Sequence, residues 1–422
     1  MSVSKFFKEA IAYRLGGGHL ADHVAMKVAT YATNPLTGGS PIGLSAQNGA
    51  VLNGSSLNYP LRKWSAALGK MRNSSHNAKL LIFGDSTTAG YGATGAVGYL
   101  SGGRAKNMPV RLAAEMNRSY EPANAHAIWG DNAITAAVLP TFDSRIVIGS
   151  GWSVTNLTSI GGSSFSASSA TASLAFTPSA TGCYSASIDT FVVWYAQVPG
   201  SGTFNWAIDA GGTTSVPTAG TASVQSVVIP AGSLAGHTLN LNYVSGSAFY
   251  ILGIQAYDST VKQVEVWQAG YSAGTTAQFI STGQPWYMQQ VVPTLAPDLT
   301  IINLQINDVN TGVSLATYLA NIQTIITYCL QSGDVILRSG YPTGISVSAN
   351  TALANQQLYR DGLAALAATN GIPFDDLFGR TNSAEIQQAV PGGAMYVSDL
   401  IHPTGNLYAE SAYSMLNLLR NW

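Results

Sequence analysis

Apolar and polar residues follow two different patterns along the chain. Compact apolar runs, typical of buried strands, stand at 79–83, 264–267, 299–304 and 334–338. Helical patterns separate or follow these runs, at 107–117, 278–292, 315–331, 350–369 and 405–419. Alternation of strands and helices predicts an α/β fold with a parallel sheet covered on both faces, whose ligands bind outside the carboxyl ends of the strands.

A different pattern occupies residues 140–259. Short runs of alternating residues are separated by Gly, Pro, Ser and Thr at turn-like intervals, and they stand at 187–193, 204–208, 223–229 and 238–243. Helical periodicity is almost absent there. We therefore predict an inserted antiparallel β-sandwich, jelly-roll-like, at 140–259, and a discontinuous α/β domain at 74–139 and 260–422. Residues 1–73, with a helical pattern at 6–13, are expected to form an arm or cap.

Composition narrows the class of partner. Charged residues are 9% of the 422 residues, hydrophobic residues are 46%, and the formal net charge is -1. This composition excludes a disordered chain, and it argues against nucleic acid or an anionic membrane, because both are bound through clustered Lys and Arg. A neutral partner such as a sugar fits better. No apolar window reaches the length of a membrane span, so we expect none. Met1 to Gly18 show no pattern of a secretory signal.

The two cysteines, Cys183 and Cys329, fall in different predicted domains. We expect two free, partly buried thiols and no disulfide framework; a bridge between them is the less favoured alternative.

A candidate nucleophile, base and carboxylate stand at the two ends of the α/β pattern. Ser86 follows the first predicted strand within Gly84-Asp85-Ser86, and Asp399 lies three residues before His402, ahead of the last helical pattern. A serine hydroxyl needs a histidine to take its proton and a carboxylate to orient that histidine. Each residue taken alone also fits a helix cap or an ordinary turn. Together they predict a Ser-His-Asp triad.

Candidate donors to a developing oxyanion follow the next two strands. Asn307 comes after the run at 299–304, and small residues, among them Ala273 and Gly274, follow the run at 264–267. Small residues let backbone N–H groups approach a substrate, and each donor aimed at an oxyanion is worth a few kcal/mol. The alternatives are a Gly-rich turn that opens a helix and, for Asn307, a cap.

These four segments together resemble the SGNH or GDSL-type serine hydrolases, named after Ser, Gly, Asn and His in four short blocks. The resemblance covers roughly residues 78–120 and 262–422. It implies a flavodoxin-like three-layer α/β/α domain, a triad of Ser86, His402 and Asp399, and an oxyanion hole from the Ser86 N–H, an N–H of Ala273 or Gly274, and the Asn307 side chain. Two positions depart from the family: Gln305 stands where a glycine is usual and is a candidate substrate contact, and Ala273 replaces the oxyanion glycine.

Some family members that remove acetyl groups from bacterial polysaccharides are similar in carrying a β-sandwich between the first two blocks. Trp152 and Trp194 lie in the predicted insert, where exposed aromatic rings could stack on sugars or, as the alternative, pack in the core.

The leading hypothesis is a serine esterase that removes O-acetyl groups from a polysaccharide, without cofactor or metal. The alternatives are a lipid or thioester hydrolase of the same fold, and a glycan-binding structural protein of the bacteriophage tail or spike type. We expect an extracellular or virion-associated protein, and the arm could mediate homo-oligomerisation.

Overall fold

The computed structural model describes residues 50–51, 60–119, 121–131, 137–155, 159–381, 383–389 and 394–420. Most of the expected N-terminal arm, with its helical pattern at 6–13, therefore lies outside the described residues. The core of the described part is a seven-stranded sheet, in which every pairing is parallel except that of the edge strand β1. In spatial order its strands are β1 (Ala50–Val51), β18 (Phe374–Asp375), β17 (Asp334–Arg338), β16 (Leu299–Asn303), β2 (Ala78–Gly84), β15 (Val264–Gly270) and β3 (Ala123–Asn124).

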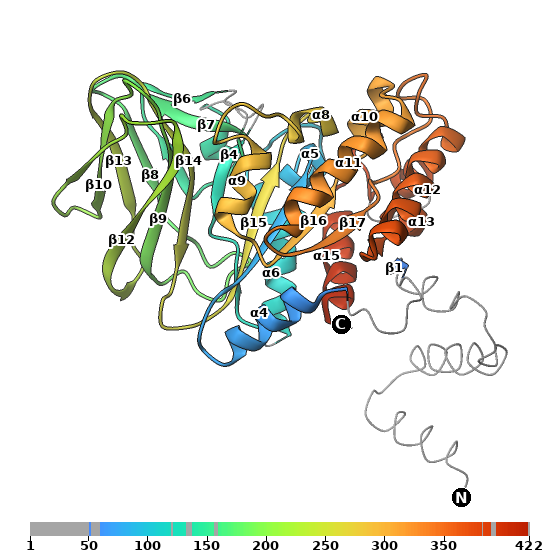
Figure 1. Ribbon diagram of the computed structural model, residues 1–422, viewed down its shortest axis with the longest axis horizontal. Helices are drawn as coiled ribbons and strands as arrows, with labels where there is room; N and C mark the ends of the chain where they lie inside the picture. The colour runs from blue at the N-terminus through green and yellow to red at the C-terminus, as the bar shows by residue number, and fades with distance from the viewer. Residues whose placement is uncertain are drawn as a thin grey trace, which may run out of the picture. The chain divides into compact units, whose positions relative to one another are not determined.

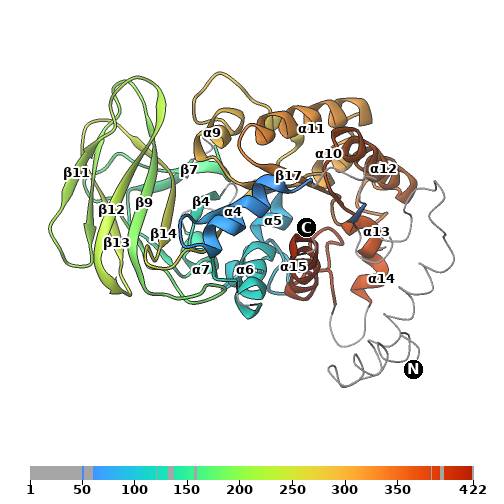
Figure 2. The same cartoon turned by 60° about the horizontal axis from the view of Figure 1, so that its bottom comes forward.

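Helices cover both faces of this sheet (Figure 1). Along β2, Leu80 and Ile82 join one hydrophobic cluster, whereas Leu81 and Phe83 join the other. The first cluster is completed by α4 (Arg62–Arg72), α6 (Met108–Arg118) and α15 (Gly405–Arg420), which Figure 2 shows together in front of the sheet. The second is completed by α9 (Met288–Leu295), α11 (Leu315–Leu330) and α12 (Leu353–Asn370). Strands buried on both faces explain the continuous apolar runs, and the predicted parallel α/β core is confirmed.

Shorter helices connect these elements. They are α5 (Ser86–Ala89), the 3₁₀ turn η1 (Arg104–Lys106), α7 (Leu139–Phe142), α8 (Thr276–Phe279), α10 (Ile306–Thr311), α13 (Leu377–Thr381) and α14 (Ala384–Gln388). Among the described helices, none has the length and apolar character that crossing a membrane requires.

Two antiparallel sheets lie between β3 and β15 along the chain. The first has the order β11 (Thr214–Pro217), β10 (Thr203–Ile208), β13 (Leu239–Ser245), β8 (Ser173–Phe176) and β5 (Ile146–Ile148). The second has the order β12 (Ser223–Ala235), β9 (Ile188–Gln197), β14 (Phe249–Tyr257), β4 (Ile128–Asp131), β7 (Gly162–Ala167) and β6 (Trp152–Thr155). Residues of both sheets, such as Phe204 on β10 and Phe191 on β9, share one hydrophobic cluster.

The antiparallel pairing begins earlier than residue 140, where the inserted segment was expected to start. Strand β4 already pairs with β14, through Trp129 opposite Gly253 and Ile128 opposite Ile254. A strand of four residues is too short to show a clear alternation, so the sequence pattern missed it. Likewise, α4 falls within the segment expected to be an arm, yet Trp64, Ala67 and Met71 are buried in the cluster on the parallel sheet.

The single helix predicted at 278–292 is wrong, because the structure has two. Helix α8 begins with a capping box, in which Thr275 and Gln278 bond reciprocally, and it ends at Phe279. Gly283 then adopts φ +104°, which no helix accommodates, and α9 begins at Met288. The predicted pair of free thiols is confirmed, with Cys183 half-buried and Cys329 buried.

Candidate active site

The loops that carry the candidate residues meet at one edge of the parallel sheet. Gly84, the last residue of β2, pairs with Gly270 at the end of β15 and with Asn303 at the end of β16. Strands in parallel register release their following loops at the same edge, where α/β sheets bind ligands. The segments that begin at Asp85, Tyr271 and Leu304 are therefore neighbours, although they are far apart in the sequence.

Ser86 is held at this edge by a tight strand-to-helix turn. Asp85 caps α5: its Oδ1 accepts hydrogen bonds from the backbone N–H and the hydroxyl of Thr87, each at 2.8 Å. A Cβ atom at Gly84 would lie 1.9 Å from the Thr88 hydroxyl oxygen, so this turn requires glycine. Ser86 is largely buried, with 9% of its surface exposed.

His402 and Asp399 complete a chain of hydrogen bonds with Ser86. The Ser86 Oγ lies 2.8 Å from His402 Nε2, and His402 Nδ1 lies 2.7 Å from Asp399 Oδ2. An ionised carboxylate only accepts hydrogen bonds, so Nδ1 carries the proton and Nε2 is left to accept the hydroxyl proton of Ser86. The structure thus brings the three residues of the predicted triad together in the order that nucleophile activation requires.

The turn that holds Asp399 keeps its side chain ionised. Burial raises the pKa of Asp399, but hydrogen bonds from the His402 imidazole and from the backbone N–H groups of Ile401 and His402 outweigh it and lower the pKa. These backbone bonds reach Oδ1 at 2.9 and 3.0 Å, and Leu400, between Asp399 and Ile401, adopts φ +56°. A charged carboxylate fixes the imidazole tautomer and stabilises the imidazolium formed during proton transfer.

The candidate oxyanion donors surround the same edge. Ser86 is the first residue of α5, so its N–H has no acceptor within that helix. Asn307 on α10 donates from Nδ2 to the carbonyl oxygen of Gly274 at 3.0 Å. The Gly274 N–H donates to the Tyr271 carbonyl oxygen at 2.9 Å, whereas among the described residues no acceptor is found for the Ala273 N–H. Ala273 adopts φ +58°, a left-handed conformation in which glycine is usual.

Asp308 links the second and third of these loops. Its carboxylate accepts hydrogen bonds from the backbone N–H and the hydroxyl of Thr276, and Asn321 donates to that hydroxyl at 2.9 Å. Burial raises the pKa of Asp308, and the hydrogen bonds from Thr276 counteract this effect. The position of Asn307 beside Gly274 is therefore fixed by the neighbouring carboxylate.

The candidate substrate contacts lie differently. Gln305 is buried, and its amide bonds the backbone of Gly340 at 3.0 Å and of Gln356 at 3.5 Å. Trp152 is 6% exposed and packs edge-on against Phe249 inside the antiparallel region. The indole N–H of Trp194 donates to the Gln255 side chain at 2.6 Å. These contacts with the protein interior fit the packing alternative for Trp152, and substrate binding by any of the three stays a prediction.

Sequence reasoning missed Tyr91, whose ring lies against the His402 imidazole with centroids 4.2 Å apart. The signal in the sequence was an aromatic residue between Gly90 and Gly92, directly after the Gly84-Asp85-Ser86 segment. Periodicity carries no information about such a turn.

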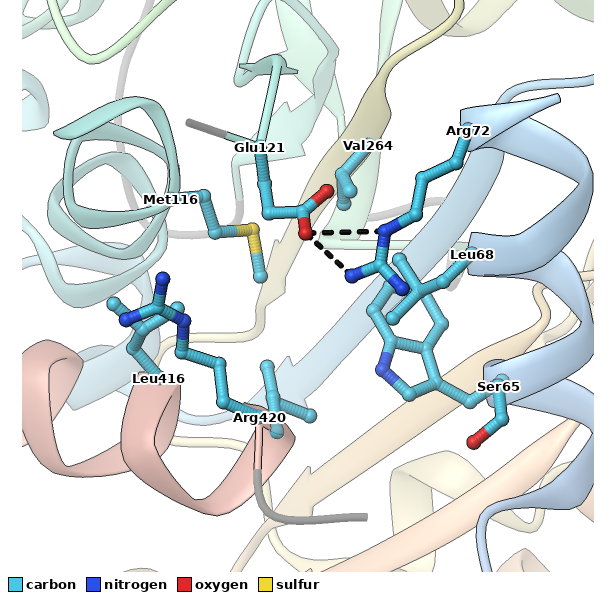
Figure 3. Close-up of a pocket in the computed structure, with 10 residues that line it drawn as sticks. Ser65, Leu68, Arg72, Met116, Glu121, Val264, Leu416 and Arg420 are labelled. Carbon is cyan, nitrogen blue, oxygen red and sulfur yellow. Dashed lines mark hydrogen bonds and ion pairs between the residues drawn. The ribbon is translucent and has the colours of Figure 1, made fainter. Parts of the chain in front are cut away.

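A cavity of about 340 Å³ lies near Val264, at the opposite end of β15 (Figure 3). It lies among α4, α6 and α15, and the ion pair between Arg72 and Glu121 borders it. No histidine is found among the described residues that line it. It therefore lacks the base that a serine nucleophile requires.

Comparison with known proteins identifies a family for part of the chain. Residues 254–409 match the model of the GDSL-like lipase/acylhydrolase family, which confirms the resemblance inferred from the four segments. The matched residues contain Asn307, Asp399 and His402, whereas Ser86 lies before them. No curated protein sequence matches this chain.

Three solved structures illustrate what the chain is similar to. A peptidoglycan O-acetylesterase is 14% identical, with a TM-score of 0.62, over 89% of this chain and 100% of that chain. A catalytic mutant of an acetylxylan esterase from Geobacillus stearothermophilus is 18% identical, with a TM-score of 0.31, over 37% of this chain and 73% of that chain. A family two carbohydrate esterase from Clostridium thermocellum is 10% identical, with a TM-score of 0.28, over 65% of this chain and 98% of that chain. The first of these has the same fold.

Proposed function

We propose that this protein is a serine esterase that removes O-acetyl groups from a polysaccharide through a covalent acyl-enzyme. The observation that carries the proposal is the hydrogen-bonded chain from Ser86 Oγ to His402 Nε2, at 2.8 Å, and from His402 Nδ1 to Asp399 Oδ2, at 2.7 Å. The match of residues 254–409 to a lipase and acylhydrolase family supports ester hydrolysis independently of this geometry.

In the first half of the reaction, Ser86 Oγ attacks the carbonyl carbon of the ester while His402 Nε2 takes the hydroxyl proton. The carbonyl oxygen becomes an oxyanion. When the bond from the acyl carbon to the sugar oxygen breaks, His402 returns the proton to that oxygen. The sugar leaves with a free hydroxyl, and the acetyl group stays on Ser86.

In the second half, water repeats the attack on the acetyl-serine. His402 takes a proton from the water, and a second oxyanion forms at the acyl carbon. The bond to Ser86 Oγ then breaks, the proton passes from His402 to that oxygen, and acetic acid leaves and loses its proton to the solvent. The products are one acetate, one proton released to the solvent and one deacetylated sugar, and the enzyme regains its starting protonation.

We assign the oxyanion hole to three donors: the Ser86 N–H, the Ala273 N–H and the Asn307 side chain. The contacts support Ala273 over Gly274, because the Gly274 N–H already donates to the Tyr271 carbonyl oxygen. A donor that is already bonded to the protein contributes less to a developing charge than a free one. The left-handed φ of Ala273, +58°, is the kind of backbone strain that persists where the surrounding structure holds a functional residue.

For the inserted region, we propose a β-sandwich built from the two antiparallel sheets, running from β4 to β14, that helps to bind the polysaccharide. Their shared hydrophobic cluster supports this proposal. The choice of acetyl rests on the similarity to a structure described as a peptidoglycan O-acetylesterase. In this proposal the α/β domain is discontinuous, and its two parts lie before β4 and after β14 along the chain.

The test measures acetate release from p-nitrophenyl acetate and from an acetylated polysaccharide by the parent protein and by Ser86→Ala. Ser65→Ala, an exposed serine on α4, is the matched control. Turnover by the parent and the control, but not by Ser86→Ala with an unchanged circular dichroism spectrum, is the expected result. No turnover by the parent, with glycan binding retained, would favour a binding protein. A strong preference for long acyl chains would favour a lipid or thioester hydrolase.

A further inference from the structure

The imidazole of His402 is held at both of its ring nitrogens and on one face of the ring. Its two nitrogen atoms bond Ser86 and Asp399, and the ring of Tyr91 lies against the face, with centroids 4.2 Å apart and planes inclined by 38°. Rotation of the imidazole about its bond to Cβ would carry Nε2 away from Ser86. The Tyr91 ring opposes this rotation because it occupies the space on that face.

Tyr91 is itself anchored to the turn that carries the nucleophile. Its N–H donates to the Ser86 carbonyl oxygen at 3.0 Å, and its own carbonyl oxygen accepts from the buried hydroxyl of Tyr408 at 2.8 Å. The next residue, Gly92, has φ +78°, and a Cβ atom there would lie 3.0 Å from the Cβ atom of His402. The backbone on both sides of Tyr91 therefore fits closely between Ser86 and His402.

A second tyrosine connects this contact to the oxyanion loop. Tyr99 packs edge-on against Tyr91, with centroids 5.0 Å apart, and its hydroxyl hydrogen-bonds the hydroxyl of Ser272, the residue before Ala273. Tyr91 therefore contacts the His402 imidazole, and its backbone N–H is hydrogen-bonded to the carbonyl oxygen of Ser86. Through Tyr99 it is also linked to Ser272, which precedes the proposed oxyanion donor Ala273.

We infer that Tyr91 is a positioning residue of the proposed esterase, which holds His402 in the orientation that accepts the Ser86 proton and stabilises the imidazolium through its aromatic face. The inference rests on the proposed function. A cation is attracted to the face of an aromatic ring. The imidazolium exists only after proton transfer, so the interaction is stronger in the transition state than in the ground state and raises kcat.

Two carboxylates lie near His402, at positions different from that of the Tyr91 ring. Asp399 bonds Nδ1 from the imidazole's own loop, and Asp85 lies beside Ser86 at the start of α5. Burial and the nearby Asp399 charge both raise the pKa of Tyr91, so its ring faces the imidazole as a neutral phenol. The phenol hydroxyl is not needed for this role, because the ring face makes the contact.

The experiment compares Tyr91→Phe, which keeps the aromatic face, with Tyr91→Leu, which keeps apolar bulk without it. For hydrolysis of p-nitrophenyl acetate, we expect Phe to retain kcat within about twofold and Leu to lower it about 3- to 30-fold, with KM changed less than kcat. Because the face favours the protonated imidazole, the acid limb of the kcat/KM profile moves to lower pH in Tyr91→Leu and stays in place in Tyr91→Phe. Tyr413→Leu, an exposed tyrosine on α15, is the matched control.

Labelling with an alkyl fluorophosphonate, which reacts with an activated serine, separates the two proposals. If the parent neither turns over nor is labelled at Ser86, the proposed function fails, and the role of Tyr91 with it. If the parent is active and Tyr91→Leu is labelled and turns over at the parental rates, only the inference about Tyr91 is wrong. Equal losses in Tyr91→Phe and Tyr91→Leu would also overturn it, since the hydroxyl rather than the face would then matter. Thermal unfolding of both variants identifies a loss that is due to misfolding.

Discussion

Removal of the Asn307 side chain tests the proposed oxyanion hole most directly. One hydrogen of its amide nitrogen is donated to the Gly274 carbonyl oxygen at 3.0 Å, and among the described residues no acceptor is found for the other. That second hydrogen is available to the oxyanion. Loss of one such donor lowers kcat by about 10²- to 10³-fold, or about 3–4 kcal/mol, whereas loss of the bond to Gly274 costs the fold only about 1 kcal/mol. Asn307→Ala therefore separates catalysis from stability.

The assay measures kcat and KM for p-nitrophenyl acetate, together with the free energy of unfolding in urea. We expect kcat to fall by the stated factor, KM to change little, and Asn307→Asp to be at least as impaired, because its carboxylate repels the oxyanion. Asn310→Ala, one turn further along α10, is the control. A kcat of Asn307→Ala within about threefold of the parent would refute the assignment of this side chain as a donor.

Three further predictions concern Asp399, Ala273 and Asp143. Asp399→Asn should lower kcat about 10³- to 10⁴-fold in the same assay, because an amide no longer fixes the Nδ1 proton of the imidazole; near-parental kcat would contradict this role. Ala273→Gly keeps the backbone donor, so kcat should stay within about twofold, and the strain relieved at φ +58° should be offset by the flexibility of glycine, leaving the free energy of unfolding within about 1 kcal/mol. For Asp143, burial raises the pKa, but Arg145 and Arg104 outweigh it and lower the pKa from 3.8 to about 2. The depressed pKa contributes about 2 kcal/mol of stability above pH 4, which is lost as the pH falls through 2, so urea unfolding should show this dependence in the parent and lose it in Asp143→Asn.

The parallel core was predictable because its strands are buried on both faces. Such strands are continuous apolar runs, and the runs at 79–83 and 334–338 correspond to β2 and β17. The rule that parallel strands present their loops at one edge also placed Ser86 near Asn307. The pairing of His402 with Ser86, 316 positions apart, was predicted from the base that a serine nucleophile requires and from the family resemblance, because no local pattern links the two residues.

What escaped prediction depends on contacts that a linear pattern does not encode. The sequence shows Gln305 as a polar residue after a strand, but its partner Gly340 lies 35 positions away and takes its side chain into the interior. An aromatic residue such as Trp152 suits either a sugar or a core, and the sequence does not show its edge-on contact with Phe249. The break between α8 and α9 contains Gly283 with a positive φ, and a hydrophobic pattern along the sequence does not show this backbone conformation.

The antiparallel sheets are joined to the parallel core by buried contacts, and this affects how a polysaccharide could be presented. Trp129 on β4 packs edge-on against Trp267 on β15, with centroids 5.9 Å apart, and covers Gly253, where a Cβ atom would lie 2.2 Å from its ring. Nearby in the sequence, the buried carboxylate of Asp143 bonds Arg104, which follows the loop of Tyr91 and Tyr99. Buried aromatic and ionic contacts hold one orientation, because separating them would expose unpaired charge and apolar surface. Under the proposed function, a glycan bound on these sheets would therefore be held in one orientation relative to Ser86.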